Sequence, residues 1–257
     1  MHVRRPTPPA SPIRGPARLR QLDGRIAQAK AAQDVDSLLE QNELGIGIAG
    51  ERSSRNALVR MDGGSLPLGE GRSLIFPDLL MQPSDRVALV GPNGSGKSTL
   101  LRRMVETNDL EVDRRIYIPQ EITAEQSIAI HEAARAVPGD RLGETMSWVR
   151  RLGSDPRHVL ASALPSPGEI RKLLLATKIA LHPYVIIMDE PTNHMDLPSI
   201  ECVEEVLADC ASGLLLVSHD RPLLDRLTEI VWSIETLDPG GTAYELKIRL
   251  GRRATGG

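Results

Sequence analysis

Two segments of the chain are apolar at almost every position. Residues 184–188 and 213–217 are aliphatic apart from one tyrosine and one glycine. Alternation of apolar and polar side chains marks a strand with one solvated face, so unbroken apolar runs indicate strands buried on both faces of a parallel sheet. Between them, residues 199–211 carry apolar side chains at helical spacing. Strands that alternate with helices predict an α/β fold.

The pattern elsewhere predicts further strands and a block of helices. Residues 86–90 and 115–118 are predicted strands, and two or three short strands are expected around residues 57–61 and 73–80. Residues 123–163 have helical spacing, interrupted by turns that contain proline and glycine. This block is therefore an insertion in the alternating α/β pattern.

The first fifty residues differ in composition from the rest of the chain. Residues 1–17 are rich in proline and arginine and are expected to be disordered, and residues 18–50 combine a helical pattern with a linker. Residues 1–30 contain seven basic residues and one acidic residue, although the whole chain has a net charge of −3. Such an arm can reach nucleic acid, and a solvated disordered tail is the alternative.

Composition limits the class of protein. A chain of 257 residues with 40% hydrophobic and 25% charged residues can bury one sizeable α/β core. No run approaches about 18 apolar residues, so no membrane insertion is expected, and no apolar segment typical of a secretory signal follows Met1. Cys202 and Cys210 are the only cysteines, and their spacing along a predicted helix is too long for a disulfide. These features predict a cytoplasmic protein.

The strongest chemical motif follows the predicted strand at residues 86–90. Residues 91–98 satisfy the pattern of a P-loop, and residues 98–104 have the pattern of a helix start. Glycines let successive backbone N–H groups converge on phosphate oxygens, while the lysine reaches the β- and γ-phosphates and the next hydroxyl binds Mg²⁺. The motif therefore predicts binding of a nucleoside triphosphate with Mg²⁺. Its nucleotide-binding candidates are Gly91, Pro92, Asn93, Gly94, Ser95, Gly96, Lys97, Ser98 and Thr99.

Four polar side chains follow three of the other predicted strands. Asp189 is placed to hold Mg²⁺, and Glu190 after it is placed to polarise the attacking water as a general base. His219 can contact the γ-phosphate, and Gln120 can reach Mg²⁺ or the attacking water. Glu190, His219 and Gln120 are thus the catalytic candidates. The candidate ligands of Mg²⁺ are Ser98, Gln120 and Asp189.

Residues 166–169 form a capping box, with Pro167 at the first helical position. On its own this sequence only starts the apolar helix predicted at residues 170–181. Alternatively, the helix N-terminus binds an anion through the Ser166 hydroxyl and the Gly168 N–H. Ser166, Gly168 and Glu169 are therefore further candidates for contact with nucleotide.

Taken in order, these motifs resemble the nucleotide-binding domain of ATP-binding-cassette (ABC) proteins. The resemblance covers about residues 56–235 and includes six motifs in the family's order. It implies a P-loop NTPase sheet flanked by helices, with an antiparallel β subdomain and a helical signature subdomain at about residues 123–175. Residues 51–257 are accordingly expected to form the ABC domain. Within the family, residues 189–196 look like the E-P-T-N-H-L-D block of ABC-F proteins.

The resemblance also implies a mechanism and partners. In ABC proteins the P-loop of one cassette faces the signature of a second, so ATP is enclosed between them and its hydrolysis lets the pair open. Many ABC-F proteins act on ribosomes, and some displace antibiotics there. An ABC-F ATPase that meets the ribosome or its RNA through the basic arm is the first hypothesis. The alternatives are the ATPase subunit of an ABC transporter and a truncated cassette that binds ATP without turnover.

Three features depart from the family pattern. The chain has one cassette, so the second must come from a homodimer or another chain, and residues 17–44 are similar to the tail of an inter-cassette linker. Pro167 replaces a glycine of the common signature and removes an N–H, so weakened or retuned catalysis is expected. Residues 65–72 contain no aromatic residue to stack on adenine, and Arg72 or Leu68 is the expected substitute.

Overall fold

The computed structural model describes residues 50–163 and 165–251. The predicted arm at residues 1–17 lies outside the described residues, and so does the helix-and-linker segment at residues 18–50, apart from Gly50. Within the described part of the chain, no helix combines the length and the apolar character that crossing a bilayer requires.

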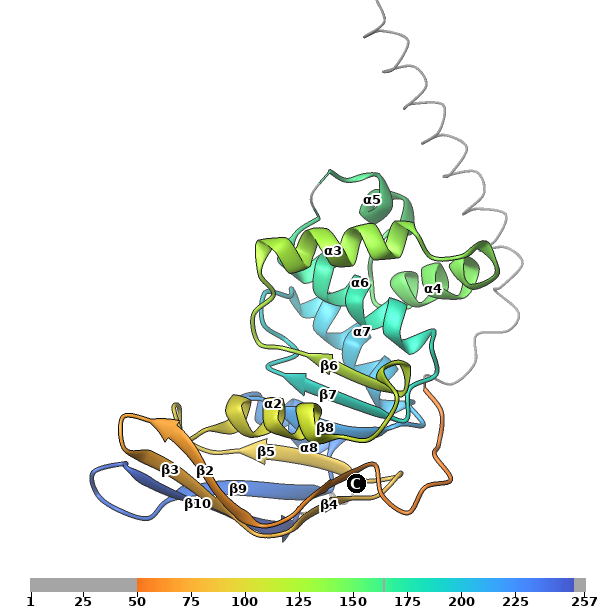
Figure 1. Ribbon diagram of the computed structural model, residues 1–257. Helices are drawn as coiled ribbons and strands as arrows, with labels where there is room; N and C mark the ends of the chain where they lie inside the picture. The colour runs from red at the N-terminus through yellow and green to blue at the C-terminus, as the bar shows by residue number, and fades with distance from the viewer. Residues whose placement is uncertain (1–49, 164, 252–257) are drawn as a thin grey trace, which may run out of the picture.

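An eight-stranded mixed sheet forms the centre of the molecule, in the order β2-β3-β10-β9-β5-β8-β7-β6. Its parallel half consists of β5 (Arg86–Val90), β6 (Arg115–Ile118), β7 (Val185–Asp189), β8 (Gly213–Val217) and β9 (Ile230–Thr236). Because these strands run in one direction, their carboxyl ends meet at one edge of the sheet (Figure 1). The predicted parallel α/β sheet is confirmed, and every residue of β7 and β8 is buried.

The two faces of the sheet pack against separate hydrophobic clusters. Along β7, Ile186 and Met188 belong to one cluster, whereas Val185 and Ile187 belong to the other. Alternate side chains of a strand point to opposite faces, so both faces of β7 are covered. This is the physical reason for the unbroken apolar runs in the sequence.

An antiparallel region extends the sheet at its other side. Its strands are β2 (Gly64–Gly69), β3 (Arg72–Phe76) and β10 (Ala243–Leu250); β10 pairs antiparallel with β9 and parallel with β3. A separate two-stranded sheet joins β1 (Val59–Met61) to β4 (Leu79–Met81). The predicted antiparallel β region is confirmed.

The two or three short strands expected around residues 57–61 and 73–80 correspond to β1, β3 and β4, and β3 and β4 belong to different sheets. Pro77 lies between them and lacks the N–H that a continuous ladder needs. The carboxylate of Asp78 instead accepts a hydrogen bond of 2.7 Å from the N–H of Gly63. A turn therefore separates the two strands.

Four helices form a layer at one end of the sheet, beside β6 and β7 (Figure 1). They are α3 (Ala124–Arg135), α4 (Gly139–Arg151), α5 (Pro156–Ala161) and α6 (Pro167–Ile179). α3 and α4 both pack on α6. The predicted helical insertion is thus present, and α6 begins at the predicted capping box. The remaining helical elements are α2 (Lys97–Thr107), η1 (Val112–Arg114), α7 (Leu197–Ala208) and α8 (Arg221–Leu227).

Candidate nucleotide-binding site

The P-loop joins β5 to α2 at the carboxyl edge of the sheet. Gly96 lies just before α2 with a φ of 94°, and a Cβ atom there would sit 2.5 Å from a methyl carbon of Leu68. At Gly91 a Cβ atom would sit 2.8 Å from the Cβ of Ile234. Backbone conformation and close packing therefore both require glycine at these positions.

Lys97 is folded back over the loop that precedes it. Its Nζ donates to the carbonyl oxygens of Gly91 at 2.8 Å and Pro92 at 2.9 Å. Burial lowers the pKa of Lys97, and the carboxylates of Glu190 and Asp189 act in the opposite direction. The side chain thus lies between the loop and the acidic residues at the end of β7, where it can meet phosphate oxygens.

The structure brings most of the sequence candidates together around one cavity of about 560 Å³. P-loop residues form one wall, and residues that follow β6, β7 and β8 form the other. The candidates that line this cavity are Asn93, Gly94, Gly96, Lys97, Ser98, Thr99, Gln120, Asp189, Glu190 and His219. Gly91 and Pro92 line an adjoining cavity together with Lys97 and His219, and Ser95 is buried.

Glu190 is held in a left-handed backbone conformation, with a φ of 52°. The residue is only 7% exposed, and its Oε1 lies 3.6 Å from Nε2 of the exposed His219 side chain. Its Oε2 accepts a hydrogen bond of 3.4 Å from the His219 backbone N–H. Non-glycine residues rarely adopt this conformation, so the surrounding contacts must hold it in place. A carboxylate fixed beside an imidazole is suited to proton transfer from a water molecule.

The groups near Asp189 fit Mg²⁺ bound together with phosphate. Its Oδ2 is buried and has no hydrogen-bond partner among the residues that the structure describes. Ser98 and Gln120 face the same cavity. Within residues 50–163 and 165–251, no three His, Cys, Asp or Glu side chains form a metal-binding group. Mg²⁺ often binds through one or two carboxylates plus substrate phosphates, and this arrangement suits such a complex.

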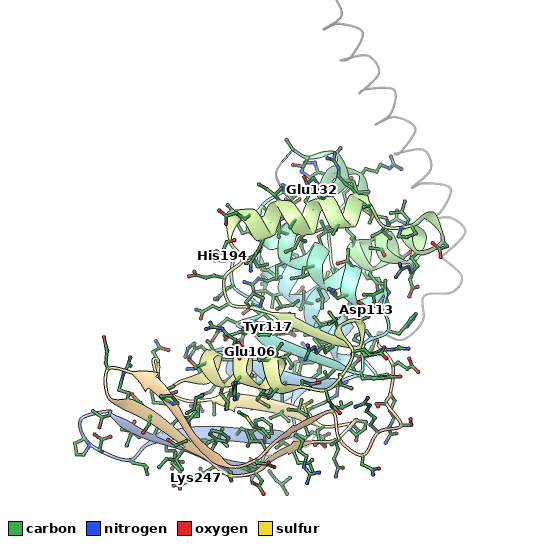
Figure 2. All side chains as sticks on the ribbon, in the orientation of Figure 1. Glu106, Asp113, Tyr117, Glu132, His194 and Lys247 are labelled. Carbon is green, nitrogen blue, oxygen red and sulfur yellow. The ribbon has the colours of Figure 1, made fainter. Side chains whose placement is uncertain are left out.

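Ser166, Gly168 and Glu169 lie at the N-terminus of α6, around a different cavity of about 360 Å³. The capping box is present: the Ser166 N–H donates to Glu169 Oε2 at 2.8 Å, and the Glu169 N–H donates to Ser166 Oγ at 3.3 Å. His194, at the side of the molecule where the strands end, packs its carbonyl against Gly168 (Figure 2). The structure therefore does not bring these candidates to the P-loop of the same chain.

Leu68 and Arg72 also line the P-loop cavity, and no described residue around that cavity is Phe, Tyr or Trp. Nη1 of Arg72 lies 3.5 Å from the carbonyl oxygen of Gly94, and its Nη2 lies 3.4 Å from Glu70 Oε2. The hairpin of β2 and β3 thus carries an aliphatic side chain and a guanidinium to the edge of the P-loop.

Sequence reasoning missed two residues of this region. Asn193 lines the P-loop cavity, and its position shortly after Glu190 was the available signal. Arg171 is buried on α6 beside the loops that hold Gln120 and Glu190. A charged residue inside an apolar helix was the only sequence signal for Arg171.

Comparison with known proteins gives matches of two functional kinds. Residues 77–193 match the family described as "ABC transporter". The chain is 36% identical to the ATP-binding protein Uup of Caulobacter vibrioides, over 73% of this chain and 32% of Uup. It is 32% identical to the zinc import ATP-binding protein ZnuC of Paracoccus denitrificans, over 66% of this chain and 70% of ZnuC. It is 33% identical to the ribosome protection protein VmlR of Bacillus subtilis, over 58% of this chain and 29% of VmlR.

The chain therefore spans about a third of the length of Uup and VmlR. Among solved structures, it resembles the cassette MJ0796 in a dimeric post-hydrolysis state bound to ADP and Pi. The TM-score is 0.55 at 16% identity, over 76% of this chain and 98% of that chain. This likeness shows that the two share a fold.

Proposed function

The chain belongs to the ATP-binding-cassette family, and from that premise we propose that it hydrolyses Mg-ATP as an ABC-F-type cassette acting on the ribosome. The ATPase part rests on one observation above all: the P-loop and the residues after β6, β7 and β8 surround a single cavity. ABC cassettes are ATPases, so this arrangement of groups is in accord with the activity proposed.

Each candidate residue has a role in this proposal. The N–H groups of residues 91–99, apart from Pro92, and the Lys97 ammonium bind the phosphates. Ser98, Asp189 and Gln120 would hold Mg²⁺, which when bound supplies charge neutralisation at the β- and γ-phosphate oxygens. Glu190 orients the attacking water and accepts its proton, while His219 lies beside Glu190 and donates toward the γ-phosphate.

A second cassette would complete the site. Ser166, Gly168 and Glu169 lie around a separate cavity, so they are available to the nucleotide of a partner cassette and not to the nucleotide of their own. Backbone N–H groups at the start of α6 suit a phosphate group there, although Pro167 contributes none. The partner is a second copy of this chain or another cassette protein. Residues 51–257 would form the cassette, with its helical subdomain at about residues 123–175.

The ribosomal role rests on residues 189–196, which look like the ABC-F block, and on the similarity to Uup and VmlR. The basic segment at residues 1–30 would contact ribosomal RNA in the cytoplasm. Antibiotic resistance is a narrower form of this role. The alternative is the ATPase subunit of a transporter, which the similarity to ZnuC favours.

Co-sedimentation with ribosomes separates these two functions. The Glu190→Gln variant, loaded with Mg-ATP, is expected to pellet with ribosomes at low salt, because it would hold the ATP-bound state. Neutralised phosphates release counterions, so binding should weaken steeply as salt rises. Lys97→Ala is the matched control that cannot load ATP. Absence of the protein from the pellet at every salt concentration, together with co-purification of a membrane protein, would establish the transporter alternative.

The same site predicts weak discrimination between purine bases. Arg72 can stack on a base, a contact worth about 1 kcal/mol where it is partly exposed. Arg72→Ala should therefore weaken ATP binding roughly fivefold. GTP should bind within about fivefold of ATP, since stacking is insensitive to the identity of the base. Competition against a fluorescent nucleotide measures both, with Arg249→Ala on β10 as the control. A strong preference for ATP that survives Arg72→Ala would contradict this assignment.

A further inference from the structure

The buried arginine of α6 has no role in the proposed chemistry described so far. Arg171 is 2% exposed and lies near the start of α6. Its Nη1 donates to the carbonyl oxygen of Glu190 at 3.2 Å, and its Nη2 donates to the carbonyl oxygen of Gln120 at 2.6 Å. Its Nε is buried without a hydrogen-bond partner in the described chain. A single guanidinium therefore bridges the segments that follow β6 and β7.

The position of Arg171 on α6 connects these loops to the capping box. Arg171 comes five residues after Ser166, which corresponds to about 7.5 Å along a helix axis. The N-terminus of α6 thus forms part of the surface available to a second cassette. Further along the same helix, Arg171 binds the backbone carbonyls of two proposed catalytic residues, Gln120 and Glu190.

Hydrogen bonds to carbonyl oxygens fix backbone position and so determine where the Gln120 and Glu190 side chains begin. This matters most at Glu190, whose left-handed conformation must be stabilised by neighbours. Its N–H donates to the Val217 carbonyl at 2.8 Å, and Arg171 binds its carbonyl. The Asn193 N–H also donates to the Glu190 carbonyl, at 3.2 Å, so removing Arg171 leaves two backbone hydrogen bonds at Glu190 and no side-chain donor to its carbonyl.

The Arg171 guanidinium also interacts electrostatically with the carboxylates of the site. Burial lowers the pKa of Arg171, while the nearby carboxylates of Asp189 and Glu190 act to raise it. An arginine remains protonated in proteins, so its fork of donors is permanently available. A lysine at this position could supply the charge but could not present two donors in a fixed plane.

We propose that Arg171 is a positioning residue that holds the loops of Gln120 and Glu190 to α6, so that contact between a second cassette and Ser166 alters the geometry of Glu190 in this chain. The inference rests on the proposed ATPase function. In this proposal α6 positions catalytic loops in its own subunit, in addition to the contact that its N-terminus would make with nucleotide in the partner's site.

The first test compares Arg171→Met and Arg171→Lys with the wild-type chain in steady-state ATPase assays. We expect kcat to fall on the order of 10- to 100-fold in Arg171→Met, because small displacements of catalytic groups have effects of this size. The Kd for ATP should change by less than about threefold, since no P-loop contact is lost. Arg171→Lys should recover only part of the rate, because it restores one hydrogen bond.

Arg86→Met provides a matched control. Arg86 donates to the carbonyl oxygens of Leu207, Ala208 and Cys210 at the opposite edge of the sheet from the P-loop. Its loss should lower the melting temperature while leaving kcat per folded molecule within about twofold. If Arg171→Met behaves in the same way, Arg171 is only structural and the inference is overturned. Absence of turnover in the wild-type chain would instead overturn the proposed ATPase function itself.

A double-mutant cycle tests the link to the capping box and does not depend on the Met variant. Ser166→Ala and Arg171→Lys are measured singly and together. If Arg171 conveys the contact at Ser166 to Glu190, the double variant should lose less kcat than the product of the two single losses. Losses that multiply would show that the two residues act independently, which contradicts the proposal.

Discussion

Replacing Lys97 with alanine should lower the affinity for Mg-ATP by at least about 100-fold, beyond detection in most titrations. The ammonium would provide charge-assisted hydrogen bonds to phosphate, each worth about 1.5–3 kcal/mol. The same substitution removes the bonds from Lys97 to the Gly91 and Pro92 carbonyls, so the loop also loses its internal support. Isothermal titration calorimetry measures the effect directly.

A control is needed because any substitution can destabilise the fold. Lys178 lies in the last turn of α6, far along that helix from the capping box, so Lys178→Ala should bind Mg-ATP as the wild-type chain does. Circular dichroism melts of both variants show whether each is folded. Retained affinity in folded Lys97→Ala would show that the P-loop assignment is wrong.

Glu190→Gln should leave ATP binding intact while reducing turnover on the order of 10²- to 10⁴-fold, the range typical of a lost general base. Glutamine keeps the shape of the side chain and can still accept from the His219 N–H, but it cannot take a proton from water. ATP that is bound and not hydrolysed should then hold two cassettes together. Light scattering should show a rise from 28.0 kDa to twice that mass on addition of Mg-ATP.

Glu205→Gln, on the exposed face of α7, is the matched control and should keep both the rate and the monomeric mass. An unchanged ATPase rate in Glu190→Gln would remove Glu190 from the catalytic role. A mass that stays monomeric with ATP would place the partner cassette on a different chain.

The sequence predicted best where local and tertiary requirements agree. β5, β7 and β8 are buried on both faces, so their apolar runs reflect the fold directly. The P-loop glycines, the capping box at Ser166 and the strand-end candidates are likewise tied to short motifs. Most residues of the candidate P-loop cavity are therefore predictable from the sequence.

The remainder depended on contacts between distant segments. β2 contains Gly64, Pro67 and Gly69, which are poor strand residues, and only its edge position makes them acceptable. The pairing of β10 with β3 joins residues more than 150 apart, which no local pattern encodes. The role of Arg171 was not predicted for the same reason. Its partners are backbone carbonyls of distant residues, which no sequence pattern indicates.

The place of β9 in the sheet constrains the order in which the protein matures. β9 pairs directly with β5, and Ile234 packs against Gly91 at the base of the P-loop. During synthesis the whole P-loop sequence is therefore complete long before Ile234, which packs against it, has been added. No nascent chain that ends before β9 can present the finished loop to nucleotide, so ATP can stabilise this fold only after the C-terminal strands have joined it.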